Sequence, residues 1–441
     1  MGLLTFSGGI HPYEGKELTM EKPIKEYLPK GDCVYPLNQH IGAPAVPVVK
    51  KGDRVLVGQK IAEASGFVSA NIHSSISGTV KAIEPRLTSG GTKVTSIVVE
   101  NDGQFEEVDF SENVMDLSTL YREDIKDIIK EAGIVGLGGA GFPANVKLSP
   151  KNEDDIDYII VNGAECEPYL TSDYRRMMEE ADKIILGLQI CVNLFDNAKG
   201  IIAIEDNKPE AIKLLTEKLK DNDKITVNAI KTKYPQGAER QLIYANTGRY
   251  VNSKMLPADA GCIVHNVDTI HAIYEAVIEG KPLIKRVVTV TGDAIEKPCN
   301  LLVRIGTNLQ ELIAAAGGFK DGIMPEKIVV GGPMMGKAVY SLDVPSTKGV
   351  SALLCMSHDE VAALEPTNCI RCGRCVDVCP GRVVPSLLAK YAEHGDIDSF
   401  LKHDGMECCE CGCCSYICPA KRHLTQTIAG TRKLILANKK K

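Results

Sequence analysis

The sequence contains no apolar run long enough to cross a membrane. The best candidate, "IILGLQICVNLF" (184–195), stops at Asp196 and has the length of a buried helix. The first residues, "MGLLTFSGGIHPYEGK", lack a basic segment followed by an apolar one. We therefore expect neither a transmembrane segment nor a targeting signal.

The charge balance does not favour nucleic acid as a partner. The formal net charge of the 441 residues is −6, and no stripe of Lys and Arg alternates with aromatic side chains. Hydrophobic residues make up 44% and charged residues 24%, which is ordinary for a globular protein. A chain of this length can form roughly two to four domains, each with its own core.

Cysteine is unevenly distributed, which argues against a disulfide framework. Ten of the 16 cysteines lie between Cys369 and Cys418, and the other six are isolated. A small secreted domain held by disulfides would spread its cysteines through the fold. We therefore expect reduced, cytosolic cysteines that hold a metal centre.

Residues 1–112 are expected to form a compact β-domain, because short Val- and Ile-rich runs alternate with turns containing Gly and Pro. The segments "KKGDRVLVGQ" and "SISGTV" resemble the barrel-sandwich fold of biotinyl and lipoyl domains. Those carriers modify a lysine at a hairpin tip, whereas the matching hairpin "FVSANIHSS" (67–75) contains none. The resemblance supports the fold and argues against a swinging-arm carrier. A lone His73 there is more often a satisfied residue than a ligand.

The hydrophobic pattern changes from about residue 118. The segment 118–133 has apolar residues at helical spacing, a cap at Ser118 and a stop at Gly133, which predicts an amphipathic helix. Strand-like runs then alternate with helical ones, which predicts a largely parallel sheet. Further on, two strands about a turn precede a helix that starts at Asn308, as in a β-grasp module.

The expected fold class is therefore multidomain α/β, with four domains. They are a barrel-sandwich-like β-domain (1–112), an α/β domain (113–283), a β-grasp module (284–350) and a helical cysteine-rich domain of the two-cluster ferredoxin type (355–435).

Two cysteine runs share one spacing. "CIRCGRCVDVCP" (369–380) follows the pattern CxxCxxCxxxCP, and "CCECGCCSYICP" (408–419) repeats it 39 residues later. In bacterial ferredoxins, three thiolates of one run and the fourth of the other hold each [4Fe–4S] cluster. We therefore expect two such clusters. Their predicted ligands are Cys369, Cys372, Cys375 and Cys418 for one, and Cys408, Cys411, Cys414 and Cys379 for the other.

Zinc is the alternative metal, since paired CxxC sequences also form tetrahedral sites with four cysteine ligands. A zinc ribbon needs only two such pairs, however, and gives no reason for the third and fourth cysteines of each run. Cys409 and Cys413 fit neither spacing and are expected to ligate nothing.

A glycine-rich loop, "GIVGLGGAGFPANVK" (133–147), follows the expected helix. Glycine lets the backbone approach a ligand and leaves N–H groups free for phosphate, and Lys147 is a nearby cation. Gly136, Gly138 and Gly141 have the spacing of a dinucleotide fingerprint, but that fingerprint needs a preceding strand and a helix precedes this loop. On these residues alone, a structural tight turn is an equally good interpretation.

Together with three later segments in the same order, the loop resembles the flavin site of the NADH-oxidising subunit of respiratory complex I. The later segments are "VNGAECEPYLTSDYR" (161–175), "YPQGAERQLI" (234–243) and "VHNVDTI" (264–270). The resemblance implies a bound FMN that accepts hydride from NADH. A flavin suits a chain with clusters because it takes up two electrons and releases them singly.

The same resemblance implies a set of site residues. Those implied to bind FMN are Gly136, Gly138, Gly139, Gly141, Lys147, Asn162, Glu165, Tyr234, Glu239 and Asn266. Glu167 and Phe142 are implied to contact the nicotinamide of NAD(H). Taken singly, each has an ordinary structural alternative as a core or solvated residue.

Four positions depart from the complex I pattern. Leu137 stands where Arg is common, Ala164 replaces an acidic residue, His265 replaces Asn, and Tyr169 replaces Gly. We expect the detailed FMN and NAD contacts to differ accordingly.

The order of the modules, beginning with "FSGGIHPYEGKELT" and "PLNQHIGAPAVPVVKKGD", resembles the RnfC subunit family of the Rnf electron-transport complex over nearly the whole chain. The resemblance implies a peripheral subunit on the cytoplasmic face of a membrane complex that moves electrons between NAD(H) and ferredoxin, coupled to Na+ or H+ transport. The implied partners are other subunits, including a ferredoxin-like one.

Two alternatives to this function remain. One is a soluble flavin and iron–sulfur reductase of the cobalamin-reductase type, against which we expect the segments "GGIHP" and "QHIGAP" to discriminate. The other is a non-catalytic electron-relay subunit without a nucleotide site.

Overall fold

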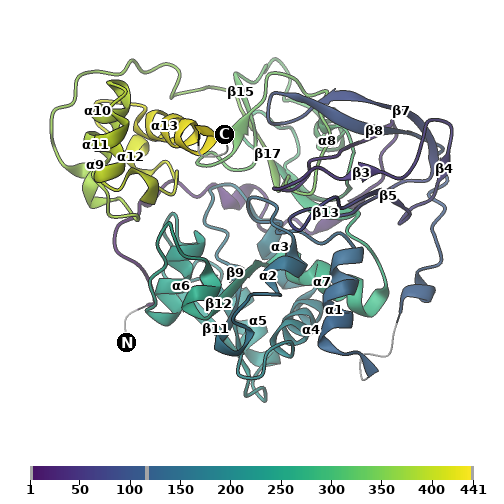
Figure 1. Cartoon of the computed structure of the whole chain (residues 1–441). Coiled ribbons are helices and arrows are strands. Elements are labelled where there is room, and N and C mark those ends of the chain that lie inside the picture. Colours follow the sequence, from purple (N-terminus) through teal and green to yellow (C-terminus); the bar gives the residue numbers. More distant parts are fainter. Residues whose placement is uncertain (1–2, 115–118, 439–441) are drawn as a thin grey trace.

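The computed structural model describes residues 3–114 and 119–438, which form four modules (Figure 1). Two β-rich modules lie together, an α/β module lies below them in this view, and a helical C-terminal module lies to one side. Within the described residues, no helix combines the length and the apolar character that a membrane span requires. The expected multidomain α/β fold is confirmed.

The N-terminal module consists of two small antiparallel sheets, as the alternation of short strands and turns predicts. One sheet has the order β2 (Cys33–Pro36), β8 (Lys93–Asn101), β7 (Gly78–Leu87), β4 (Arg54–Val55). The other has the order β3 (Val46–Pro47), β5 (Lys60–Glu63), β6 (Ile72–His73). His73 is buried on β6, and burial lowers its pKa to about 3, so the imidazole is neutral near pH 7.

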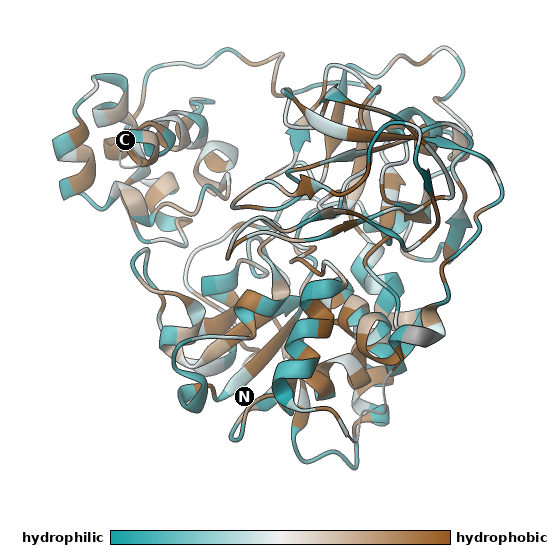
Figure 2. Ribbon diagram, turned by 45° about the vertical axis from the view of Figure 1, so that its right-hand side comes forward, coloured by the Kyte–Doolittle hydropathy of each residue, from teal (hydrophilic) through white to brown (hydrophobic). Residues whose placement is uncertain are grey.

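The α/β module has a four-stranded, fully parallel sheet. Its order is β11 (Ile225–Ile230), β10 (Lys199–Glu205), β9 (Tyr158–Gly163), β12 (Cys262–Asn266). Its helices are α1 (Arg122–Glu131), α2 (Ala144–Lys147), α3 (Ser172–Glu179), α4 (Ala181–Val192), α5 (Pro209–Lys218), α6 (Glu239–Thr247) and α7 (Val267–Glu279). Hydrophobic residues concentrate on its strands and inward helix faces (Figure 2).

Helix α1 begins later than the sequence suggested. The proposed cap, Ser118, lies outside the described residues, and the helix starts after Tyr121, whose backbone N–H donates to Asp124 Oδ2 (2.9 Å). The predicted stop is confirmed, since Gly133 follows the helix with a φ of +66°. The buried face of α1 joins a hydrophobic core that continues into the N-terminal module.

The β-grasp module contains a six-stranded mixed sheet with strands from outside residues 284–350. The order is β1 (Ile24–Tyr27), β14 (Cys299–Arg304), β13 (Lys285–Thr291), β17 (Ala352–Met356), β15 (Lys327–Val330), β16 (Lys337–Ala338). Helix α8 (Leu309–Ala315) starts where expected, with Asn308 Oδ1 accepting from the N–H of Gln310 (2.8 Å). The sequence pattern missed β1 and β17 because both pair with strands far away in the chain.

The C-terminal module is helical, as the ferredoxin-like spacing predicted. Its helices are α9 (Arg374–Asp377), α10 (Pro385–Glu393), α11 (Ile397–Lys402), α12 (Cys413–Ile417) and α13 (Leu424–Asn438). A separate small core forms where α10 and α13 pack together, with Leu388, Phe400 and Ile428 fully buried.

Asn300 joins three parts of the chain. Its Oδ1 accepts from the hydroxyls of Thr171 (3.0 Å) and Thr289 (2.7 Å), and its Nδ2 donates to the carbonyls of Thr19 (3.0 Å) and Lys22 (3.1 Å). The residue is fully buried, so water cannot replace these bonds. One amide therefore fixes the N-terminal segment and the start of α3 to the β-grasp sheet.

We predict that Asn300→Leu lowers the free energy of unfolding by roughly 3 to 5 kcal/mol, because two hydroxyls and two carbonyls lose buried partners. Urea unfolding followed by circular dichroism measures the change. Asn197→Leu, at an exposed position, is the matched control and should shift the midpoint little. Equal shifts in the two variants would contradict the role of Asn300.

Candidate functional site

The candidate flavin site lies at the carboxyl edge of the parallel sheet. The chain places β10 on one side of β9 and later β12 on the other, so the connections switch direction between β9 and β12. Open α/β sheets bind their ligands at such a switch point. Asn162 on β9 and Asn266 on β12 are register partners at this edge. A Cβ added at Gly138 would lie 2.9 Å from Asn266 Cβ, so three predicted residues from three segments converge.

Hydrogen bonds hold the glycine loop in a fixed shape. The N–H of Gly136 donates to the carbonyl of half-buried Phe142 (2.8 Å), which closes the loop. The N–H of Leu137 donates to Thr269 Oγ1 (2.9 Å), and the buried Arg286 donates to the Leu137 carbonyl (3.2 Å). The loop is therefore shaped before any ligand arrives.

The remaining glycines of the loop serve two different purposes. Gly138 and Gly139 are exposed, and no atom lies within 4 Å of a Cβ built on Gly139, so the backbone there is accessible. Gly141 instead has a φ of +70°, and its added Cβ would lie 3.2 Å from the carbonyl oxygen of Gln39. A loop of the N-terminal module thus packs directly on the glycine loop.

Lys147 connects two further predicted segments. Its Nζ donates to Glu239 Oε1 (2.7 Å) and to the carbonyl of Val264 (2.8 Å). Asn162 Nδ2 donates to the carbonyl of Gly237 (2.7 Å). The structure therefore brings the segment around residues 234–243 to the end of β9, beside the glycine loop.

Glu165 contacts the start of helix α3. Its Oε1 accepts from the N–H of Asp173 (2.7 Å) and its Oε2 from that of Tyr174 (3.3 Å), which favours the helix electrostatically. Asp173 also accepts from Asn266 Nδ2 (2.6 Å), and burial, with Glu165 nearby, raises the pKa of Asp173 to about 8. No pattern in the sequence singled out Asp173, although it lies within the quoted segment 161–175.

Glu167 contacts a loop of the β-grasp module. Its carboxylate accepts from the backbone N–H groups of Met334 (3.1 Å) and Met335 (2.8 Å). A Cβ on Gly332 would lie 2.2 Å from Glu167 Oε2, so the loop must have glycine there. Burial raises the pKa of Glu167 to about 7. The carboxyl group can therefore change charge near neutral pH.

A buried lysine from the N-terminal segment fixes this region. Lys16 Nζ donates to the carbonyls of Glu165 (2.8 Å), Glu167 (3.1 Å) and Leu170 (2.7 Å). Three carbonyls around one ammonium hold residues 165–170 in a curved path. No local sequence pattern marks Lys16 as a site residue, because its partners are about 150 residues away in the chain.

Three of the four positions that depart from the complex I pattern are buried, and the fourth has a left-handed backbone. Leu137 and Ala164 are buried, and the Ala164 carbonyl accepts from Lys208 Nζ (2.7 Å). His265 is buried, which lowers its pKa to about 3. Tyr169 has a φ of +69°, the left-handed region that favours glycine. Glycine, the residue of the complex I pattern at this position, would therefore fit the backbone conformation that Tyr169 adopts.

Tyr234 joins the candidate flavin site to the second cysteine run. Its hydroxyl donates to the carbonyl of Cys411 (2.8 Å), and Cys413 Sγ donates to the Tyr234 carbonyl (3.8 Å). The residue is 1% exposed, in a small apolar cluster with Cys411 and Cys413. Met334 reaches the same run, since a Cβ on Gly412 would lie 3.3 Å from its Cε.

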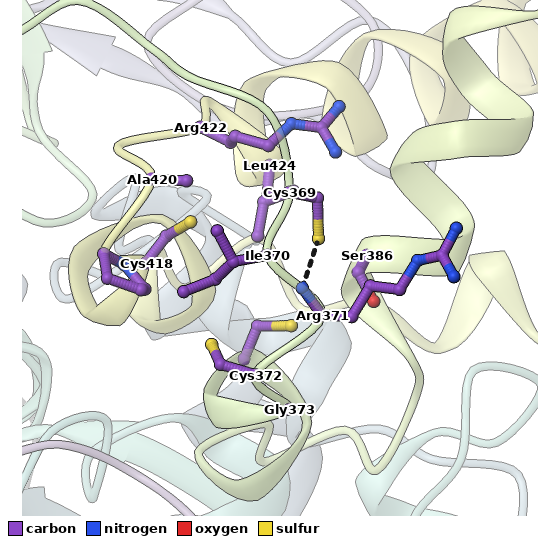
Figure 3. Close-up of a pocket in the computed structure, with 12 residues that line it drawn as sticks. Cys369, Ile370, Arg371, Cys372, Gly373, Ser386, Cys418, Ala420, Arg422 and Leu424 are labelled. Carbon is purple, nitrogen blue, oxygen red and sulfur yellow. Dashed lines mark hydrogen bonds between the residues drawn. The ribbon is translucent and has the colours of Figure 1, made fainter.

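The eight predicted cysteine ligands gather around two cavities. The first cavity (Figure 3) is lined by Cys369, Cys372, Cys375 and Cys418. The second is lined by Cys379, Cys408, Cys411 and Cys414. Each cavity therefore takes three cysteines from one run and the fourth from the other, the division expected from the spacing.

The two runs also share their backbone geometry. Arg371 and Glu410, 39 residues apart, both have a φ of +57°. Their backbone N–H groups donate to Cys369 Sγ and Cys408 Sγ, each at 3.4 Å. Such N–H to sulfur bonds are a means by which proteins tune iron–sulfur centres.

Cys409 and Cys413 border the second cavity without matching the ligand spacing. Cys413 is fully buried against Tyr234, so it packs at the contact with the α/β module. Across residues 3–114 and 119–438, no three His, Cys, Asp or Glu side chains converge as ligands of a single metal ion.

Four known families match successive parts of the chain. They are described as RnfC Barrel sandwich hybrid domain (residues 4–104), Nuo51 FMN-binding domain (129–275), SLBB domain (287–338) and 4Fe-4S binding domain (363–384). The last match covers the first cysteine run and ends before the second.

The chain is similar to whole subunits of known complexes. It is 44% identical to the C subunit of the Na(+)-translocating ferredoxin:NAD(+) oxidoreductase complex of Acetobacterium woodii, over 99% of this chain and 98% of that protein. It is 48% identical to the C subunit of the proton-translocating ferredoxin:NAD(+) oxidoreductase complex of Clostridium ljungdahlii, over 88% of this chain and 84% of that protein.

A solved NAD+-reducing [NiFe]-hydrogenase in the H2-reduced state resembles the fold, with a TM-score of 0.50 and 15% identity over 72% of this chain and 61% of that one. That likeness concerns the fold alone. Identity above 40% over most of the length of both relatives is decisive: the chain belongs to the family of RnfC subunits of ion-translocating ferredoxin:NAD+ oxidoreductase complexes.

Proposed function

We propose that this chain exchanges hydride with NAD(H) through FMN and passes single electrons through two [4Fe–4S] clusters, as a subunit of a membrane-bound NAD:ferredoxin oxidoreductase complex. The names of its relatives, which include ferredoxin:NAD+ oxidoreductases that translocate Na+ or protons, support this function. Its partners are other subunits, among them a ferredoxin-like one, and it lies peripherally on the cytoplasmic face of the membrane.

The residues at the switch point fit FMN. The exposed backbone at Gly138 and Gly139 leaves N–H groups for the phosphate, and Lys147, which pairs with Glu239, lies in the short helix that follows the loop. Asn162 and Asn266 bring amide groups to the same edge of the sheet. When bound, FMN accepts a hydride and releases its electrons one at a time.

The cysteine cavities fit two iron–sulfur clusters. Each offers four thiols, of which one already accepts a backbone N–H, in the divided arrangement of a two-cluster ferredoxin. The alternative of zinc does not explain this division between runs.

Glu167 and Phe142 position the nicotinamide. The backbone carbonyl of Phe142 closes the glycine loop, and its half-buried side chain lies close to the exposed Gly138 and Gly139 in the sequence. The N–H groups of Met334 and Met335 orient the Glu167 carboxylate, and burial holds its pKa at about 7. An ionised carboxylate at this position stabilises the positive charge that develops on nicotinamide as hydride leaves.

The hydrogen bond from Tyr234 to the Cys411 carbonyl is the observation that carries the proposal. It links Tyr234, in a segment that resembles the flavin site of complex I, to Cys411, which lines the second cysteine cavity. This contact supports a short path for electrons between a flavin and a cluster. A non-catalytic relay would not need a nucleotide site next to its clusters.

Anaerobic purification followed by iron and flavin analysis, and then addition of NADH, tests the function. We expect FMN, about eight irons per chain, and bleaching of both flavin and cluster absorbance by NADH. Zinc without iron would refute the clusters. Iron without flavin, or a flavin that NADH cannot reduce, would refute the proposed reaction.

We predict that Glu167→Gln slows flavin reduction by NADH roughly tenfold, about 1.4 kcal/mol of barrier. In the unaltered protein the rate should rise with pH through about 7, because the carboxyl group loses its proton there. The variant should lack this rise, since an amide does not ionise. Stopped-flow absorbance measures both effects.

Glu217→Gln, at an exposed position of α5, is the matched control and should keep the original pH profile. An unchanged rate and profile in Glu167→Gln, with clusters intact, would remove Glu167 from the nicotinamide site.

We predict that Cys409→Ser and Cys413→Ser each leave about eight irons per chain.

Cys418→Ala should abolish the same electron paramagnetic resonance signal as Cys375→Ala, because both cysteines line the first cavity. Cys414→Ala should abolish the other signal. If Cys418→Ala instead resembled Cys414→Ala, the division of ligands between the runs would be wrong.

A further inference from the structure

The two cysteine cavities differ in exposure although their backbones match. Cys369 and Cys372 of the first cavity are exposed, whereas Cys411 and Cys414 of the second are buried. The second cavity faces the α/β module through Tyr234. We call the first cavity the outer site and the second the inner site.

Comparison of the runs at their 39-residue offset shows that their side chains also differ in chemistry. The pairs, first run before second, are Ile370 and Cys409, Arg371 and Glu410, and Arg374 and Cys413. Arg371 and Glu410 have the same φ angle, so the backbone around the cysteines does not by itself demand different side chains in the two runs. Side chains that hold the inner site inside the protein are replaced, at the outer site, by an exposed apolar residue and exposed cations.

Two cations, Arg371 and Arg422, line the outer site, and two more, Arg374 and Lys421, directly adjoin lining residues in the sequence. We call these four residues the basic collar. Arg422 pairs with Glu393. The other three are exposed and form no ion pair with any described residue. The first run itself contributes one acidic residue, Asp377. The collar thus carries three unpaired cations on a chain whose net charge is −6.

An exposed apolar residue, Ile370, lines the outer site together with Arg371 and Arg422. Ile370 is 67% exposed, and it lies among Cys369, Cys372 and Cys418 in Figure 3. An apolar centre with a charged rim is the usual composition of a protein docking patch. Complementary charge at the rim accelerates encounter and orients the partner.

The geometry points to the basic collar as the docking site of an acidic one-electron iron–sulfur carrier protein. This inference rests on the proposed function, because it assumes a cluster at the outer site. In the exchange, one electron leaves the reduced carrier, which is oxidised, and enters the outer site, which is reduced; no bond forms or breaks and no proton moves. The inner site, against Tyr234, exchanges electrons with the flavin.

The test uses the full chain with its cofactors and a reduced two-[4Fe–4S] ferredoxin of strongly negative net charge. We expect Arg371→Gln/Arg374→Gln to weaken binding and to lower the second-order rate of electron transfer, each roughly tenfold at low ionic strength. Both differences should vanish near 0.5 M salt, where surface charges are screened. Thermophoresis gives the Kd and stopped flow gives the rate.

Lys390→Gln/Lys402→Gln removes two exposed cations of the same module away from the cavities and is the matched control. Reduced methyl viologen, a small cation, is the control donor, and the collar variant should accept electrons from it undiminished. An unchanged Kd for ferredoxin, or an equal loss of rate with viologen, would overturn the docking role. NADH-dependent bleaching of the same samples tests the proposed function separately. A failure of the proposed function can therefore be told apart from a failure of the docking role.

Discussion

The contact between Tyr234 and the second cysteine run is the constraint on which the rest of the structure depends. The N-terminal segment maintains it. Ile10 and Tyr234 exchange both backbone hydrogen bonds (2.8 and 2.9 Å), and the N–H of Gly9 donates to the carbonyl of Val378 (2.9 Å). A Cβ on Gly9 would lie 2.8 Å from the Tyr234 carbonyl oxygen. This close approach explains the glycines of "GGIHP", which runs between the α/β and helical modules (Figure 1).

The β-grasp module contributes to the same junction. Its loop at residues 331–336 donates two N–H groups to Glu167, and Met334 on that loop also lies against Gly412. A shift of this loop would therefore act on both candidate sites at once. The N-terminal module contributes through Gln39, which packs on Gly141. Both β-rich modules thus act as supports that hold the glycine loop and the acidic segment in position.

The features that could be predicted from the sequence are those encoded by short-range patterns. Cysteine spacing anticipated which cysteines line each cavity, three from one run and the fourth from the other. The alternation of strands and helices anticipated the parallel sheet. The partners of Lys16, Glu167 and Tyr234 could not be predicted, because they lie on other modules and no local pattern marks a long-range contact. The same reason explains why strands β1 and β17 were missed.

The duplicated cysteine motif places one backbone geometry in two unequal environments. Ligand type and spacing are the same in both runs, so any difference in reduction potential must come from the surroundings. Reduction adds a negative charge, which water and nearby cations stabilise. The outer site has both, from its exposed cysteines and from the basic collar, whereas the inner site is buried beside Tyr234 and Cys413. With clusters at both positions, as we propose, the outer one would retain an electron more readily than the inner one, and it would also be the one that a carrier could reach.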